Sequence, residues 1–376
     1  MLTGERCFEA FNRLPGLRLG GTHWTIWSWL AIQPVKVLQV GGIIGGVGQV
    51  LHIVYPLSTE YVPLSVGLWC VVVAITVAAL VSFRGYQFIE RTSLALLASF
   101  TVMTLVCVVA LQWTPYAISA ADIASGLKFH VPSGALFFVI GAFGLTGVGG
   151  DEIMYYNYWL IEKGYAAQTG ACQADDPAWQ RRARGWIRVM YLDALLSMVL
   201  YTLVTSAFYV LGAAVLHAES AIPEGFAMIE TLATVYTRSL GPWARDVFLA
   251  GAFVVLFSTL FAALAAWTRI FTDAFGQVGL IDFDNLDSRR RTIFALSWAF
   301  PFLWTASYFL YSKPVAMVMI GGVGTSLMLL IVVVAALYFR YRGGVAALRP
   351  GWCYDAALWL SVVAIVGMAV YSIAKT

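Results

Sequence analysis

Long apolar runs, separated by short polar stretches, dominate the pattern along this chain. Each run has about 20 residues or more, the length that a helix needs to cross roughly 30 Å of hydrocarbon. The runs lack the alternating pattern that is typical of outer-membrane strands. The pattern therefore predicts an all-α polytopic membrane protein with nine spans, at residues 24–53, 62–83, 92–112, 134–160, 186–215, 246–272, 292–311, 314–339 and 354–373.

Composition and charge support this class. Hydrophobic residues make up 60% of the chain and charged residues only 11%, whereas soluble domains carry about 25% charged residues. With the N-terminus in the cytoplasm, the inner segments hold 17 Lys and Arg residues and the outer segments hold 5. Inner loops carry such an excess. We therefore expect a multi-pass protein of the cell (inner) membrane, with a cytoplasmic leader at residues 1–23, one transmembrane domain at 24–376 and the C-terminus outside.

The sequence lacks several common enzyme motifs. It contains no P-loop, no GxSxG elbow and no HExxH pair, which are the signatures of phosphate-binding, hydrolase and zinc-protease sites. We expect no enzyme activity, no resident cofactor and no nucleic-acid partner. The expected partners are the lipid bilayer and a transported metal ion or small solute.

The fourth span contains an interruption, which is predicted near residues 144–151. Its segment "GLTGVGG" has four glycines within seven residues, and each glycine weakens a helix by about 1 kcal/mol relative to alanine. The acids Asp151 and Glu152 follow directly. Broken helices persist in membranes where the freed backbone lines a cavity, and there they form substrate and ion sites.

Two compatible interpretations of these acids remain open. In the first, Asp151 is the N-cap of a second half-helix and Glu152 is a first-turn acid. In the second, both acids bind a cation or proton, and a metal ion in particular. The backbone of the break would supply the other ligands, from Thr146, Gly147, Gly149 and Gly150. An acid at mid-membrane costs at least about 2.5–3.5 kcal/mol, so it must be paired, protonated or hydrated.

Lys36 lies within the first span. A rise of 1.5 Å per residue puts Lys36 on the order of 15–20 Å above the cytoplasmic end of its span, and the two acids on the order of 12–15 Å above theirs. Because these depths are similar, Lys36 is a candidate charge partner for Asp151 or Glu152. The alternative is that its long side chain reaches back to the membrane surface.

From about residue 136 onward, the chain resembles the Nramp family of divalent metal transporters, which have the LeuT-type inverted-repeat fold. The resemblance rests on "GLTGVGGDEIMYYNYWLIEKGYA", "ARGWIRVMYLDALLSMVLYT" and "VLFSTLFAALAAWTRIFTDAFG", and a divergent bacterial branch is the nearest match. It implies secondary transport of a divalent metal cation, with proton coupling as a further expectation. By this alignment the nine spans match the third to eleventh helices of the family, and the family's first two helices and its Asp-Pro-Gly-Asn motif are absent from this sequence.

The departures from the family fall on its binding residues. Where the family has Met-Pro-His, this sequence has Gly149-Gly150-Asp151. Replacing a soft thioether by oxygen ligands shifts the preference from Mn, Fe and similar ions towards Mg, Ca or no metal, and the choice between Mg and Mn stays open. Two alternatives remain, namely transport of a small cationic or neutral organic solute on the same fold, and a truncated membrane scaffold without transport.

Overall fold

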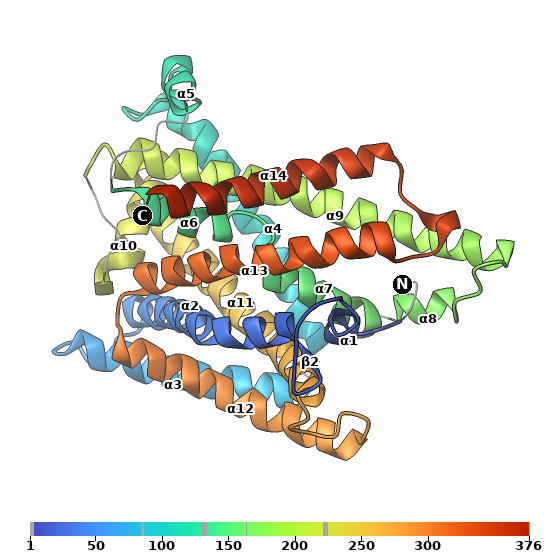
Figure 1. Cartoon of the computed structure of the whole chain (residues 1–376). Helices are drawn as coiled ribbons and strands as arrows, with labels where there is room; N and C mark the ends of the chain where they lie inside the picture. The colour runs from blue at the N-terminus through green and yellow to red at the C-terminus, as the bar shows by residue number, and fades with distance from the viewer. Residues whose placement is uncertain (1–3, 84–85, 129–133, 163, 221–224, 376) are drawn as a thin grey trace.

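The computed structural model describes residues 4–83, 86–128, 134–162, 164–220 and 225–375, and it consists almost entirely of helices (Figure 1). Within these residues, eight helical segments are long and apolar enough to cross a membrane. A shorter apolar helix, Leu97–Trp113, lies at the expected third span. The helices of the spans are α2 (Trp24–Val54), α3 (Val62–Ser82), α4 (Tyr86–Ala110), α6 (Leu136–Leu145) with α7 (Gly150–Glu162), α9 (Pro177–Leu211), α11 (Ala244–Gln277), α12 (Leu286–Leu310), α13 (Pro314–Arg342) and α14 (Trp352–Lys375).

Short elements connect these helices. They are α1 (Cys7–Phe11), a two-stranded antiparallel hairpin of β1 (Arg18–Leu19) and β2 (Thr22–His23), α5 (Ala120–Gly126), α8 (Tyr165–Thr169), α10 (Met228–Leu240), the 3-10 turns η1 (Leu111–Trp113), η3 (Gly225–Ala227) and η4 (Ala346–Leu348), and the π-helical turn η2 (Gly212–Leu216) that ends α9. The fold is therefore the all-α polytopic architecture that the hydropathy pattern predicts.

Helix α9 begins earlier than the predicted span at residues 186–215. Its N-cap is Asp176, whose side chain accepts hydrogen bonds from the backbone N–H groups of Ala178 and Trp179. Pro177 occupies the first turn, where a missing N–H costs nothing. This cap extends the helix into the segment that the sequence pattern assigns to an inner loop.

Helix α2 lies at the centre of the bundle, between α13 and the pair α3 and α12 (Figure 1). The glycines of α2 permit this central, closely packed position. A Cβ atom on Gly45 would overlap the ring of Tyr308, and one on Gly42 would lie 2.7 Å from the carbonyl oxygen of Pro314. Small residues let helix backbones approach closely in membranes. Helix α2 is thus a tightly packed scaffold against which the site is built.

The N-terminal segment packs into the protein. Phe8 and Leu14 are buried in the core. Arg6 Nε lies 3.5 Å from Asp273 Oδ1 on α11, and the Tyr158 hydroxyl of α7 donates to Asp273 Oδ2 at 2.6 Å. Asp273 therefore joins both the N-terminal segment and α7 to α11, a contact that the assignment of residues 1–23 as a cytoplasmic leader did not predict.

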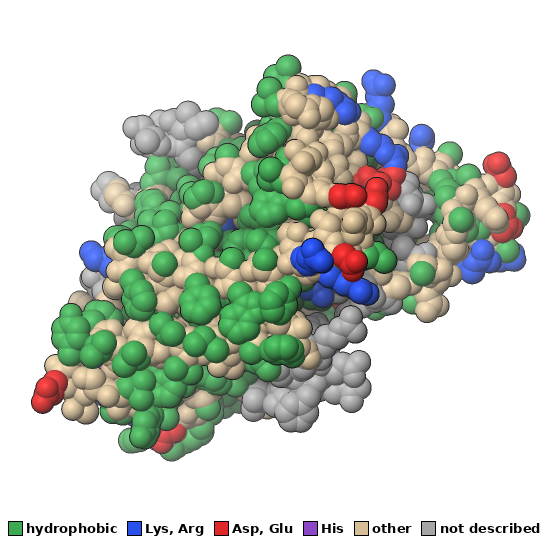
Figure 2. All heavy atoms as spheres, turned by 90° about the horizontal axis from the view of Figure 1, so that it is seen from below, with side chains coloured by type: hydrophobic (Ala, Val, Ile, Leu, Met, Phe, Trp, Pro, Cys, Tyr) green, Lys and Arg blue, Asp and Glu red, His purple; other side chains and the backbone are tan. Residues whose placement is uncertain are grey.

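Side-chain types are unevenly distributed over the surface. Figure 2 shows a broad apolar face, with most of the visible Lys and Arg side chains gathered towards one end of the molecule. Many large apolar side chains are exposed on the long helices. A lipid-facing apolar belt with a basic end accounts for both observations.

Candidate functional site

The predicted break in the fourth span is present. Helix α6 ends at Leu145 and α7 begins at Gly150, with residues 146–149 unwound between them. Gly147 has a positive φ of 154°, which favours glycine because side chains with a Cβ clash there. One of the backbone carbonyls that the break leaves without a helical partner still accepts a hydrogen bond, because the Tyr201 hydroxyl of α9 donates to the Leu145 carbonyl at 2.7 Å.

The glycines on either side of the break hold it against α13. A Cβ atom on Gly144 would overlap the carbonyl oxygen of Gly322, and one on Gly150 would lie 2.8 Å from Met328 Cβ. Gly144 is itself still helical. Because the two backbones approach this closely, the unwound segment is fixed next to the middle of α13.

Asp151 points into the protein interior. Its side chain is 1% exposed. The indole Nε1 of Trp29 donates to Oδ1 at 2.9 Å, and Lys36 Nζ lies 3.4 Å from Oδ2. The ion pair that the matching depths predict is therefore present, and it joins α2 to the start of α7.

The interpretation of Asp151 as the N-cap of the half-helix is wrong. Helix α7 begins one residue earlier, and the carbonyl of Gly149 accepts the first bond, from the N–H of Ile153 at 3.2 Å. Asp151 lies in the first turn, where the helix dipole still favours a negative charge. Its side chain is thereby free to meet Lys36.

Lys36 is enclosed by protein. It is 3% exposed, so its side chain does not reach the membrane surface. Its Nζ also donates to Thr325 Oγ1 at 2.6 Å, and that hydroxyl donates to the Gly321 carbonyl at 3.1 Å. The ammonium therefore bridges α2, α7 and α13, all three of which border the break.

Glu152 has a different environment from its neighbour. Its side chain folds back over the break, where a Cβ atom on Gly149 would collide with Oε2 and with the Thr325 methyl group. Its carboxylate interacts with the backbone N–H of Gly149. Part of the side chain still reaches the surface. The two acids thus divide into a buried, paired Asp151 and an accessible Glu152.

Comparison with known families identifies the chain. A sequence model of the natural resistance-associated macrophage protein-like (Nramp) family matches residues 20–375. This chain belongs to the Nramp family. The family comprises membrane transporters of metal ions and not enzymes, and its LeuT-like fold agrees with the helical architecture. No curated protein matches the chain.

Within this Nramp protein, the described residues contain no group of three or more His, Cys, Asp and Glu side chains that could hold a metal ion. Met154, one turn further along, is 2% exposed and belongs to the hydrophobic core. A soft sulfur ligand is thus not directed at the break from this position.

Sequence reasoning missed three partners of the site, which are Trp29, Thr325 and Tyr201. Trp29 lies seven residues before Lys36, two helical turns away on the same face of α2, and this spacing is the one signal that the sequence offers. Thr325 and Tyr201 come from helices distant in the sequence. Only the packing of α13 and α9 around the break brings them to it.

Proposed function

We propose that this Nramp protein transports a divalent cation across the cell membrane and that the ion binds at the break between α6 and α7. The observation that carries the proposal is the buried Lys36–Asp151 ion pair, with 3.4 Å between its charged atoms, beside the accessible Glu152. Intramembrane ionisable groups are expensive and mark ion pathways. A broken helix in a family of metal transporters is where such a pathway is expected.

The proposed ligands are all oxygen atoms. Glu152 is the proposed entry ligand, because its side chain is partly exposed whereas Asp151 is buried. Asp151 Oδ2 makes no hydrogen bond among the described residues, so it keeps a lone pair that a cation can use. Backbone carbonyls in and next to the break, those of Thr146, Gly147, Gly149 and Gly150, complete the proposed set. Oxygen ligands of this kind suit hard cations such as Mg, Ca and Mn.

Charge balance suggests how the proton is coupled. Two carboxylates, the Lys36 ammonium and a divalent ion together leave one positive charge in a region of low dielectric constant, which is unfavourable. Loss of one proton from this charge cluster would restore neutrality. We therefore propose that the cation competes with Lys36 for Asp151 and that binding is linked to release of one proton from the cluster.

Reconstituted vesicles test this function. The purified protein is placed in proteoliposomes, and internal dyes report uptake of Mg, Ca or Mn together with internal pH. We expect saturable uptake of at least one of these metals and a pH change that accompanies the uptake. In Lys36→Gln the metal flux should no longer change the pH, whereas the exposed control Lys128→Gln should behave like the wild type.

Two outcomes would overturn the proposal. Absence of uptake of all three metals by protein that is correctly folded would contradict a transport function. Uptake of a radiolabelled organic cation without any metal uptake would favour the alternative, in which the same break recognises a small organic solute.

A further inference from the structure

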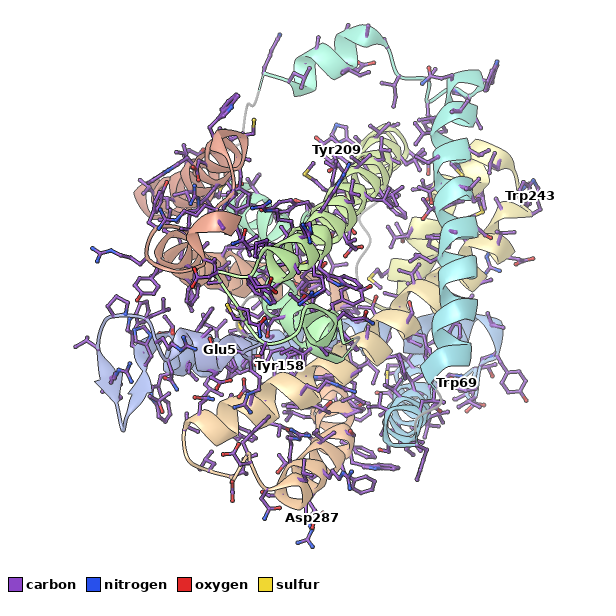
Figure 3. All side chains as sticks on the ribbon, turned by 90° about the vertical axis from the view of Figure 1, so that its right-hand side faces the viewer. Glu5, Trp69, Tyr158, Tyr209, Trp243 and Asp287 are labelled. Carbon is purple, nitrogen blue, oxygen red and sulfur yellow. The ribbon has the colours of Figure 1, made fainter. Side chains whose placement is uncertain are left out.

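A basic hollow lies at the end of the molecule where the Lys and Arg side chains gather. It has a volume of about 620 Å³ and lies where the N-terminal segment, α7, α9 and the connection between α13 and α14 meet. Figure 3 looks onto this end of the molecule, with Glu5 and Tyr158 labelled close to each other. The charged residues that line the hollow are four arginines and one carboxylate, namely Arg13, Arg340, Arg342, Arg349 and Glu5.

Two of these arginines are already engaged. Arg340 makes a bidentate contact with Asp355, at 2.5 Å from Nε to Oδ1 and 2.7 Å from Nη2 to Oδ2. Arg13 pairs with Glu5. Among the described residues, Arg342 and Arg349 are exposed and make no ion pair. The hollow therefore has two guanidinium groups available for an anion.

An apolar hollow of about 580 Å³ adjoins the basic one, and the two share Tyr191, Pro350 and Tyr354. The apolar part also includes Trp352, which is 79% exposed. Tyrosine and tryptophan gather at the membrane–water boundary, where one part of the ring is apolar and another is wet. A ligand that fills both hollows must have an anionic group and an apolar chain.

The geometry points to a binding site for an anionic phospholipid of the cytoplasmic leaflet. Arg342 and Arg349 bind the phosphate, for which the planar guanidinium group is well suited. The acyl chains lie along Trp352 and Tyr354. The charge bias predicts that this end faces the cytoplasm, and basic pockets between helices on that side bind anionic headgroups. Because α13 contributes both to this site and to the proposed ion site at the break, lipid occupancy can stabilise the helix whose Thr325 accepts a hydrogen bond from Lys36.

Lipid binding to the intact protein tests this site. Purified protein in nanodiscs of phosphatidylcholine is titrated with fluorescent phosphatidylglycerol. We expect tight binding that excess phosphatidylcholine does not displace. Each arginine near an anionic lipid is worth about fivefold in affinity. The double variant Arg342→Gln/Arg349→Gln should therefore bind about 25-fold more weakly.

The matched control is Arg290→Gln/Arg291→Gln. It removes two exposed arginines from the same end of the molecule, at the start of α12 and outside the hollow. Equal losses in both double variants would overturn the site in favour of general surface charge. Equal competition by inorganic phosphate would overturn the role of the apolar hollow. In the variant Trp352→Gln, lipid binding should weaken while the thermal stability of the lipid-free protein is retained.

Discussion

The buried ion pair between Lys36 and Asp151 gives the most quantitative prediction. Its charged atoms are 3.4 Å apart and both side chains are almost fully buried. At an effective dielectric constant of ~20, their attraction is about 5 kcal/mol. Much of this gain offsets the cost of removing both charges from water. Loss of one partner is nevertheless severe, because it leaves the other charge buried without compensation.

The variants Lys36→Met and Asp151→Asn should each lower the free energy of unfolding by about 3–5 kcal/mol. The double variant should be much less destabilised than the sum of the two, with a coupling energy above about 1 kcal/mol. Reversible unfolding in mixed detergent micelles measures these values, and Lys128→Met is the exposed control. Strictly additive single effects, or a fully stable Lys36→Met protein, would refute the reasoning.

Three further predictions concern the surroundings of the site. Gly144→Ala should destabilise the protein by about 1–3 kcal/mol in the same unfolding assay, because its Cβ meets a carbonyl of α13. The control Gly185→Ala, in open space on α9, should stabilise the protein by about 0.5–1 kcal/mol. Equal effects of the two substitutions would contradict the close packing of Gly144 against α13. Arg6→Gln should free the N-terminal segment from Asp273, so limited trypsin digestion should cleave that segment faster than in the wild type; unchanged cleavage would contradict the fastening role. Backbone N–H groups hold the pKa of Asp176 below its usual range, so its cap stabilises the start of α9 while ionised and is lost as pH falls through that lowered pKa. Hydrogen-exchange protection in the first turn of α9, expressed relative to the intrinsic exchange rate at each pH, should therefore fall in acid for the wild type and be low at all pH values in Asp176→Ala. Wild-type protection that does not depend on pH would refute this.

The sequence predicts the break and its ion pair because both depend on local or one-dimensional features. A cluster of glycines weakens a helix wherever it packs. The depths of Lys36 and Asp151 follow from counting residues along helices of known rise. The helix class follows in the same way, because the length and polarity of each run decide whether it can cross a membrane.

Other parts of the site depend on packing that one sequence does not encode locally. Thr325 meets Lys36 from 289 positions away along the chain. Arg6 meets Asp273 across a similar separation. The early start of α9 was missed for a different reason, since Asp176-Pro177 is a recognisable cap that lies within a strongly polar stretch. The polar composition of that stretch favoured a loop, but the N-cap at Asp176 starts the helix there.

Transport by the variant Glu152→Gln tests the central claim most directly. This substitution keeps the shape of the side chain and removes its negative charge at the break. The matched control is Glu60→Gln, an exposed acid on the loop between α2 and α3. In proteoliposomes, Glu152→Gln should raise the concentration of Mg or Ca needed for half-maximal uptake by about tenfold or more, equivalent to at least about 1.4 kcal/mol. The control should match the wild type, and a Glu152→Gln protein with wild-type uptake would contradict a cation site at the break.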